Sequence, residues 1–247
     1  MLASGKHDVE YVLAIDSDDV TAPQIRHLRH CTVSEASRPL CPPEAWNRAI
    51  KATDADVYLH TCDDAVVIVD NWDATLAQLP GLPGPNRLLM AANNLGCPNV
   101  PTMFMASREW IDLVDGELLD PLFPFWFSDT AAAELWSLVT GEPFPIAMGF
   151  QILTKGQQPN PGLRDMDFWW QVYAARRRDR LAKAAEIRAK LGMPLPATLG
   201  AMIKRFEERD RHDSIFQQGL AAKLLPSEPS ERYLVARKRA EDYLAER

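Results

Sequence analysis

Two short apolar segments of this chain each end in a cluster of carboxylates. The first is YVLAIDSDD, residues 11–19, and the second is DVYLHTCDD, residues 56–64. Apolar runs of this length, rich in β-branched and aromatic residues, are typical of buried strands. In open α/β sheets ligands bind outside the carboxyl ends of the strands, so acids that follow two strands would line one crevice. Crowded carboxylates need a counter-ion and suit hard cations, which predicts a site for Mg²⁺ or Mn²⁺.

The first 165 residues alternate between strand and helix patterns. Besides the two segments above, strands are predicted at 87–94, 101–107 and 144–153, and helices at 43–53, 70–79, 108–116 and 129–141. Ser128 or Asp129 is the predicted N-cap of the last helix, and Gly141 ends it. Residues 20–44, with four prolines, are predicted to form a loop with at most one short helical turn. The alternation predicts an α/β, Rossmann-like fold with a mostly parallel sheet flanked by helices.

The composition shifts near residue 166. Three long, charged helical patterns follow, at 168–192, 201–225 and 230–246. We therefore predict an α/β domain over residues 1–165 and a helical C-terminal extension over 166–247. These amphipathic helices could dock on the α/β core or form the interface of a homo-oligomer. The basic run ARRRDR, residues 175–180, is predicted to be a solvated helix face, with contact to phosphate or an anionic membrane surface as the alternative.

Charge and apolar content exclude several classes of protein. The formal net charge of −7 disfavours a general nucleic-acid-binding role, which usually needs an excess of Lys and Arg. No apolar stretch reaches the ~20 residues of a membrane-spanning helix, and the N-terminal segment lacks the apolar core of a signal peptide. The four cysteines are scattered without CxxC pairs, which predicts free thiols in a reducing compartment. Together these features predict a cytoplasmic protein without a transmembrane segment.

The order of the motifs resembles that of the family 2 glycosyltransferases of the GT-A fold. The resemblance rests on PPEAWNRAIKATDADVYLHTCDDAVVIVDNWDATL, residues 42–76, in which an Asn-Arg pair, an acidic motif and a Trp-Asp pair follow one another. The string FPFWFSDTAAAELW, residues 123–136, is similar to the acceptor-side motif of that family, in which an acid stands ahead of a helix. The resemblance covers roughly residues 9–170 and implies a GT-A-like fold and sugar transfer from a nucleotide-sugar donor to a carbohydrate or other hydroxyl acceptor.

The resemblance also implies roles for individual residues. Asp129 would be the base that deprotonates the acceptor hydroxyl, and Asp64, together with Asp63, would bind Mg²⁺ or Mn²⁺. Residues predicted on the donor side are Asp16, Asp18, Asn47, Arg48, Asp63 and Arg164. Asp16 would contact the nucleotide base or ribose, and Asp63 the ribose or diphosphate. No third metal ligand is evident; His212 is a candidate, but the many charges around it favour an exposed helix histidine instead.

Two of these assignments come from the residues themselves and keep an alternative. Trp126 lies in an aromatic-rich stretch and is predicted to stack on the acceptor, but such residues also serve as core. Arg164 follows a loop and could close over the diphosphate, or it could be a surface arginine beside a helix cap.

Two other functions stay open. The family has one strand and one helix ahead of the segment equivalent to residues 9–15, whereas only eight residues precede Val9 here. This departure leaves a degenerate GT-A-like domain, which binds or assembles without catalysis, as one alternative. The string VLAIDSDDVT, residues 12–21, also fits the start of haloacid dehalogenase-type phosphatases, with Asp16 as nucleophile and Asp18 as general acid. That family usually has Gly where this chain has Asp19.

Overall fold

The computed structural model describes residues 8–28, 31–37, 41–62, 65–77, 89–95, 101–124, 127–154, 165–208 and 231–247. The chain divides into two compact units. Unit one contains Met1–Leu40, Glu44–Leu118 and Pro145–Gln157, and unit two contains Cys41–Pro43, Leu119–Phe144 and Gln158–Arg247. This division differs from the predicted boundary at residue 165, because residues 119–144 group with the C-terminal helices and not with the strands.

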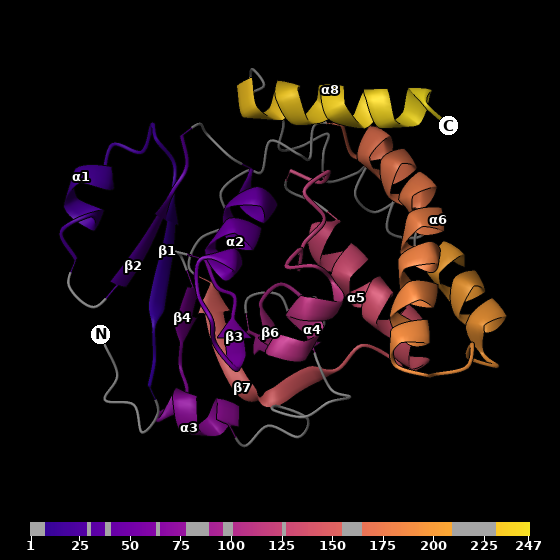
Figure 1. Cartoon of the computed structure of the whole chain (residues 1–247), viewed down its shortest axis with the longest axis horizontal. Coiled ribbons are helices and arrows are strands. Elements are labelled where there is room, and N and C mark those ends of the chain that lie inside the picture. The colour runs from indigo at the N-terminus through magenta and orange to yellow at the C-terminus, as the bar shows by residue number, and fades with distance from the viewer. Residues whose placement is uncertain are drawn as a thin grey trace. The chain divides into compact units, whose positions relative to one another are not determined.

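Unit one contains two separate sheets. Strands β1 (Tyr11–Ile15) and β2 (Cys31–Glu35) lie side by side and parallel, in register from Tyr11 opposite Cys31 to Ile15 opposite Glu35 (Figure 1). The second sheet has five strands in the order β3-β6-β5-β7-β4. Their bounds are β3 (Val57–Leu59), β4 (Ala65–Val67), β5 (Leu89–Asn94), β6 (Phe104–Ser107) and β7 (Ile146–Thr154).

The prediction of a mostly parallel sheet is wrong for the larger sheet. Among the described residues of that sheet, only β5 and β7 pair in parallel, whereas β3–β6, β6–β5 and β7–β4 are antiparallel. Parallel neighbours need a crossover connection of about a dozen residues or more, and the link 95–103 between the paired strands β5 and β6 is too short for one. The apolar runs of the strands carry no signal for the direction of pairing, which is why the pattern did not reveal it.

The described helices of the strand-rich part of the chain are α1 (Ala22–Ile25), α2 (Pro42–Lys51), α3 (Trp72–Ala77) and α4 (Arg108–Leu113). The predictions of α2, α3 and α4 are confirmed. Strand β2 is a correction, because residues 20–44 were predicted to be loop. Its sequence CTVSE has polar residues at most positions, so it lacks the apolar run by which the other strands were recognised.

The core of the five-stranded sheet is built from residues of four different elements. Seven side chains are buried together in it: Leu76, Ala92, Met103, Met105, Ala147, Phe150 and Ile152. Because neighbouring side chains of a strand point to opposite faces, β7 can bury Ile152 while Leu153 stays partly exposed beside it. The loop cysteine Cys62 packs against this cluster, and none of Cys31, Cys41 and Cys62 forms a disulfide, as predicted.

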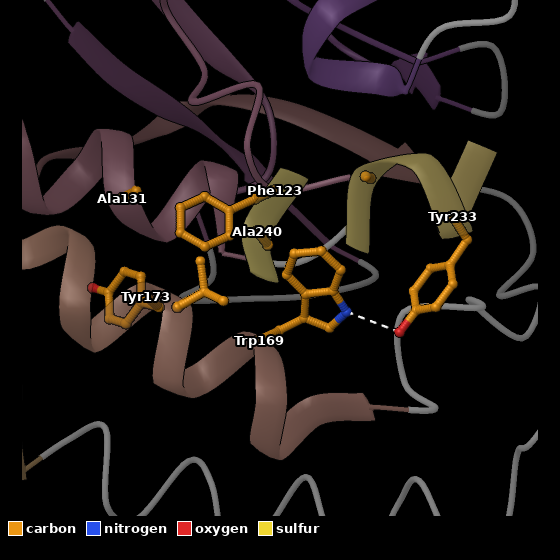
Figure 2. Close-up of a cluster of buried hydrophobic side chains, with 8 residues drawn as sticks. Phe123, Ala131, Trp169, Tyr173, Tyr233 and Ala240 are labelled. Atoms are coloured by element: carbon orange, nitrogen blue, oxygen red, sulfur yellow. Dashed lines mark hydrogen bonds between the residues drawn. The ribbon is translucent and has the colours of Figure 1, made fainter. Parts of the chain in front are cut away.

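Unit two is helical. Its described helices are α5 (Ser128–Thr140), α6 (Met166–Lys190), residues 199–208 and α8 (Glu231–Ala245). Phe123, Trp169, Tyr173 and Tyr233 form a buried aromatic cluster, in which the indole nitrogen of Trp169 donates to Tyr233 Oη at 3.1 Å (Figure 2). Among the described helices, none combines the length and apolarity needed to cross a membrane.

The two ends of α5 differ in how well the sequence predicted them. Gly141 ends the helix with a left-handed φ of 84°, as its position predicted. At the other end neither Ser128 nor Asp129 is the N-cap. That position is taken by Phe127, which has a φ of 70° and makes no side-chain capping bond. A left-handed backbone at a bulky residue costs about 1–3 kcal/mol, so neighbouring groups must hold this turn.

A buried charge network joins α5 to α6. Glu134, only 1% exposed, accepts hydrogen bonds from Arg177 Nε at 2.8 Å and Arg180 Nη2 at 3.1 Å, and another from the hydroxyl of Tyr173. Burial alone would raise the pKa of Glu134, but the two arginines and these hydrogen bonds outweigh it and lower the pKa. Arg177 and Arg180 are buried as well. The prediction that residues 175–180 form a solvated face is therefore wrong for these two arginines.

We expect Glu134→Gln to lower the free energy of unfolding by about 3–5 kcal/mol, because it leaves two buried guanidinium groups without their counter-charge. Chemical denaturation at neutral pH measures this. The matched control is Glu186→Gln, because Glu186 pairs with Lys183 and Lys190 on the exposed surface of α6. Its loss should stay below about 1 kcal/mol. Equal effects of the two substitutions would contradict the assignment.

Candidate functional site

The carboxyl ends of β1 and β2 are joined by one arginine from α2. Arg48 Nη2 donates to the carbonyl of Ile15 at 3.0 Å and to the carbonyl of Ser34. The carbonyl of Ile15 also accepts from the backbone N–H of Ala36 at 3.0 Å. Because the two strands run in parallel, these carbonyls lie at the same edge, the edge where the sequence predicted a ligand site.

Asp16 and Asp19 lie in a tight turn that follows β1 directly. The N–H of Asp19 donates to the carbonyl of Asp16 at 3.2 Å. The carboxylate of Asp19 accepts from the N–H and hydroxyl of Thr21, at 2.7 and 2.6 Å, just before α1 begins. These bonds give Asp19 a local structural role that is ordinary for an Asp in a turn. Asp16 is half-buried, and Asp18 is exposed to solvent.

The pKa of Arg48 is affected by the negative charge of Asp16. Burial lowers the pKa of Arg48, while the charges of Asp16 and Glu35 act in the opposite direction without cancelling the effect of burial. Glu35 ends β2 and is itself bound by Arg26, whose Nε donates to Glu35 at 2.9 Å. Asp16, Arg48 and Glu35 thus place alternating charges along one edge of the small sheet. The structure brings together the two donor-side residues Asp16 and Arg48, whereas Asn47, on the same helix as Arg48, is buried.

His60 follows β3 directly and precedes the second acidic segment. Its backbone N–H continues the sheet by donating to the carbonyl of Phe104 at 2.8 Å. The imidazole is buried, with its ring centroid 3.9 Å from that of Trp46 and 6.3 Å from that of Phe104. Neither ring nitrogen has a hydrogen-bond partner within the described part of the chain. Burial therefore lowers the pKa of His60 to about 3, which keeps the ring neutral.

Five residues named from the sequence lie outside the described residues: the acidic pair Asp63 and Asp64, together with Trp126, Arg164 and His212. Nowhere in the described ranges do three or more His, Cys, Asp or Glu side chains gather closely enough to hold a metal ion. The carboxylates of Asp63 and Asp64 are oxygen ligands of the kind that Mg²⁺ and Mn²⁺ prefer, so the donor chemistry is suitable. The metal site stays a prediction.

Asp129 lies in unit two, in the first turn of α5. Its carboxylate accepts the N–H of Thr130 at 2.7 Å, and the side chain is half-buried. A negative charge at this place is favoured by the helix dipole. The neighbouring Ser128 is buried, whereas the Asp129 carboxylate keeps partial access to solvent. A half-exposed carboxylate is chemically able to accept a proton from a bound hydroxyl group.

Sequence reasoning missed three features of these regions. Glu35 went unnoticed because its strand was not predicted, and His60 looked like one more residue of an apolar strand. The bridge that Arg48 makes between two strand ends leaves no local sequence signal, since its partners are backbone carbonyls. A histidine inside an apolar strand was visible in DVYLH and could have been marked as a buried titratable group.

Acid should destabilise the protein through His60. The pKa of the His60 imidazole is about 3 in the folded protein, whereas its ordinary value is 6.5. Between these values the unfolded chain binds a proton that the folded chain does not, so stability falls as pH falls from about 6.5 towards 3. From pH 7 to pH 5 the wild type should lose about 2 kcal/mol more than His60→Leu. Urea titrations at both pH values measure this.

The exposed His27 provides the control for that experiment. His27→Leu should keep the pH dependence of the wild type. Identical pH dependence in the wild type and His60→Leu would show that His60 is not buried in the neutral form.

Comparison with known proteins gives a similarity in structure and none in sequence. No protein-family model matches the sequence, and no curated protein sequence is similar to it. Among solved structures, the chain is similar to the mannosyltransferase PcManGT from Pyrobaculum calidifontis, a structure in complex with GDP-Man and Mn²⁺. The TM-score is 0.50 with 13% sequence identity, over 96% of this chain and 78% of that one. This chain therefore has a mixed α/β fold of the kind found in a glycosyltransferase.

Proposed function

We propose that this chain is a GT-A-type glycosyltransferase related to family 2. It would move a sugar from a nucleoside-diphosphate sugar to an acceptor hydroxyl. The observation that carries the proposal is the fold similarity, over 96% of the chain, to a mannosyltransferase that binds GDP-Man and Mn²⁺. The motif order over residues 42–76 supports it independently, because it was recognised without any structure.

The donor would bind at the carboxyl ends of the strands in unit one. Asp16 is half-buried at the end of β1 and would accept hydrogen bonds from the nucleotide base or ribose, with Asp18 beside it. Arg48 holds the ends of β1 and β2 together through their carbonyls, so it would keep Asp16 in place. Asn47, Asp63 and Arg164 would complete the proposed donor side, and Arg164 would close over the diphosphate.

Asp64, assisted by Asp63, would hold a divalent cation, either Mn²⁺ or Mg²⁺. When bound, such an ion neutralises negative charge on the departing diphosphate. Two adjacent carboxylates supply the hard oxygen ligands that the ion needs. GDP with Mn²⁺ is the natural first probe, since the similar mannosyltransferase binds GDP-Man and Mn²⁺.

Asp129 would be the general base on the acceptor side. Its carboxylate would take the proton of the acceptor hydroxyl while that oxygen attacks the anomeric carbon and the bond from sugar to diphosphate breaks. This assignment fits an inverting reaction, in which the base acts directly on the nucleophile. Trp126 would provide an apolar face on which the acceptor stacks. The acceptor would be a carbohydrate or another hydroxyl compound.

The alternatives differ in how they use the same residues. A degenerate domain would bind nucleotide without turning it over, and the binding and turnover experiments below separate that case. The phosphatase alternative, with Asp16 as nucleophile, gains no support from the fold. In the described part of the chain β1 pairs only with β2, and the mannosyltransferase PcManGT, to which the fold is similar, is a glycosyltransferase.

GDP binding should depend on Mn²⁺ and on Asp64. Isothermal titration of the wild type with GDP should show binding in the presence of Mn²⁺ and at least 10-fold weaker binding with a chelator, because the ion links the diphosphate to the carboxylates. Asp64→Ala should behave like the chelated wild type. Asp112→Ala is the control, since Asp112 is 66% exposed on α4. Full Mn²⁺-dependent binding by Asp64→Ala would overturn the metal assignment.

Asp129→Asn should abolish turnover and spare donor binding. With GDP-Man, Mn²⁺ and water as the acceptor, the release of GDP should slow by about 10²–10⁴-fold, because the amide cannot accept the proton. The dissociation constant for GDP should change less than 2-fold. Unchanged GDP release would exclude Asp129 as the base. GDP binding by a wild type that releases no GDP would favour the non-catalytic alternative.

A further inference from the structure

The start of helix α5 has an unusual geometry directly ahead of Asp129. Phe127 occupies the N-cap with φ 70° and ψ −11°, a left-handed conformation that bulky side chains rarely adopt. N-caps are usually Ser, Thr, Asp or Asn, whose side chains bond to the helix, and Phe127 makes no such bond. Its carbonyl nevertheless begins the helix by accepting the N–H of Ala131 at 2.7 Å. The direction of the first turn, which carries Asp129, is thus set by a residue in an unfavourable conformation.

Aromatic packing holds this turn. The ring of Phe127 stacks on that of Tyr173, with centroids 4.9 Å apart and planes at 23°. Phe123 packs against both rings, at 6.2 Å from each, and both Phe123 and Tyr173 are fully buried. Offset stacking at these distances is favourable and directional. A shift of the Phe127 backbone to a relaxed conformation would move its ring out of this stack.

Tyr173 is itself held from several directions. Its hydroxyl donates to the buried carboxylate of Glu134, and its backbone carbonyl accepts from Arg180 Nη2 at 2.9 Å. The guanidinium of Arg180 also lies over its ring, 4.2 Å from the centroid. Glu134 belongs to the same helix as Asp129, so the contacts that start at Phe127 and pass through Tyr173 return to α5. Phe127 at the helix start and Glu134 further along both bind one residue of α6.

We propose that Phe127 is a positioning residue for the Asp129 carboxylate, acting through its stack on Tyr173, which Glu134 holds in place. This inference rests on the proposed function, because it presupposes that Asp129 takes the proton of the acceptor. Residues in strained backbone conformations gather at functional sites, where the surrounding structure fixes one geometry. A base must stand within hydrogen-bond reach of the proton that it takes, so a small displacement of this turn would slow the reaction.

Phe127→Ala tests the proposal, since it removes the ring and leaves the unfavourable φ unsupported. Three measurements are made: GDP release from the nucleotide sugar, GDP binding with Mn²⁺, and hydrogen–deuterium exchange of the Ala131 amide. We expect a kcat at least 10-fold lower, an unchanged dissociation constant for GDP, and Ala131 exchange at least 10-fold faster. A purely structural role would not lower kcat while binding and folding stay intact.

Phe144→Ala is the matched control. Phe144 is also half-buried, lies just beyond the other end of α5 and packs edge-on against Trp136 at 5.6 Å. Its removal should change neither kcat nor the exchange of Ala131. Tyr173→Leu, which removes the same stack from the side of α6, should reproduce the effects of Phe127→Ala.

The possible results distinguish a failure of this inference from a failure of the proposed function. If Asp129→Asn stops GDP release while Phe127→Ala keeps the wild-type kcat, the positioning role is wrong and the proposed function stands. If Ala131 exchanges at the wild-type rate in Phe127→Ala, the stack does not hold the turn, and the inference fails whatever the activity. If the wild type neither binds GDP nor releases it, the proposed function fails and the catalytic role of Phe127 fails with it.

Discussion

The alignment of α5 with α6 in unit two depends most on the ion pairs that Glu134 forms with Arg177 and Arg180. The buried residues of α5 combine small side chains, Ala131, Ala132 and Ala133, with the larger Trp136, Leu138 and Val139, and the packing of all these apolar groups is non-directional. A carboxylate bound by two arginines and a tyrosine is directional, so it selects one alignment of α5 against α6. Buried ion pairs seldom add much net stability over apolar residues, but the loss of one partner is costly. The network therefore specifies the arrangement more than it strengthens it.

In unit one, arginine side chains fix the arrangement of two strands in a similar way. A sheet of only two strands is marginal by itself, and β1 and β2 are held by more than their own ladder. Arg48 binds carbonyls at both strand ends, and Arg26 binds the Glu35 carboxylate at the end of β2. Both arginines act at the edge where Asp16 lies. The same contacts that complete this small sheet therefore shape the surface to which a donor nucleotide is proposed to bind.

The two proposed halves of the reaction lie in different compact units. Asp16 and Arg48 belong to unit one, whereas Asp129 and the aromatic residues that support it belong to unit two. Folds of the glycosyltransferase kind serve many substrates, so the fold by itself does not name the sugar or the acceptor. The chemistry of the individual carboxylates carries the functional argument, and each carboxylate can be tested within its own unit.

Local patterns in the sequence determined where most elements lie. Strands β1 and β3, helices α2 and α5, and the Gly141 end of α5 all follow from apolar runs, from a proline near a helix start and from a glycine at a helix end. These features are predictable because they depend on neighbours within a few residues. Asp16 at the end of a strand and Asp129 at the start of a helix were found in the same way.

Tertiary structure alone decided the rest. The antiparallel pairing of β4 with β7, the grouping of α5 with the C-terminal helices and the burial of Arg177 and Arg180 all depend on partners far away in the chain. A charged run such as ARRRDR looks solvated until a carboxylate some 40 residues away, Glu134, is placed against it. Phe127 looks like ordinary core until its backbone is seen in a left-handed turn. The sequence by itself determined the elements and the carboxylates at their ends, whereas long-range ion pairs and stacking, which leave no local pattern, decided their arrangement.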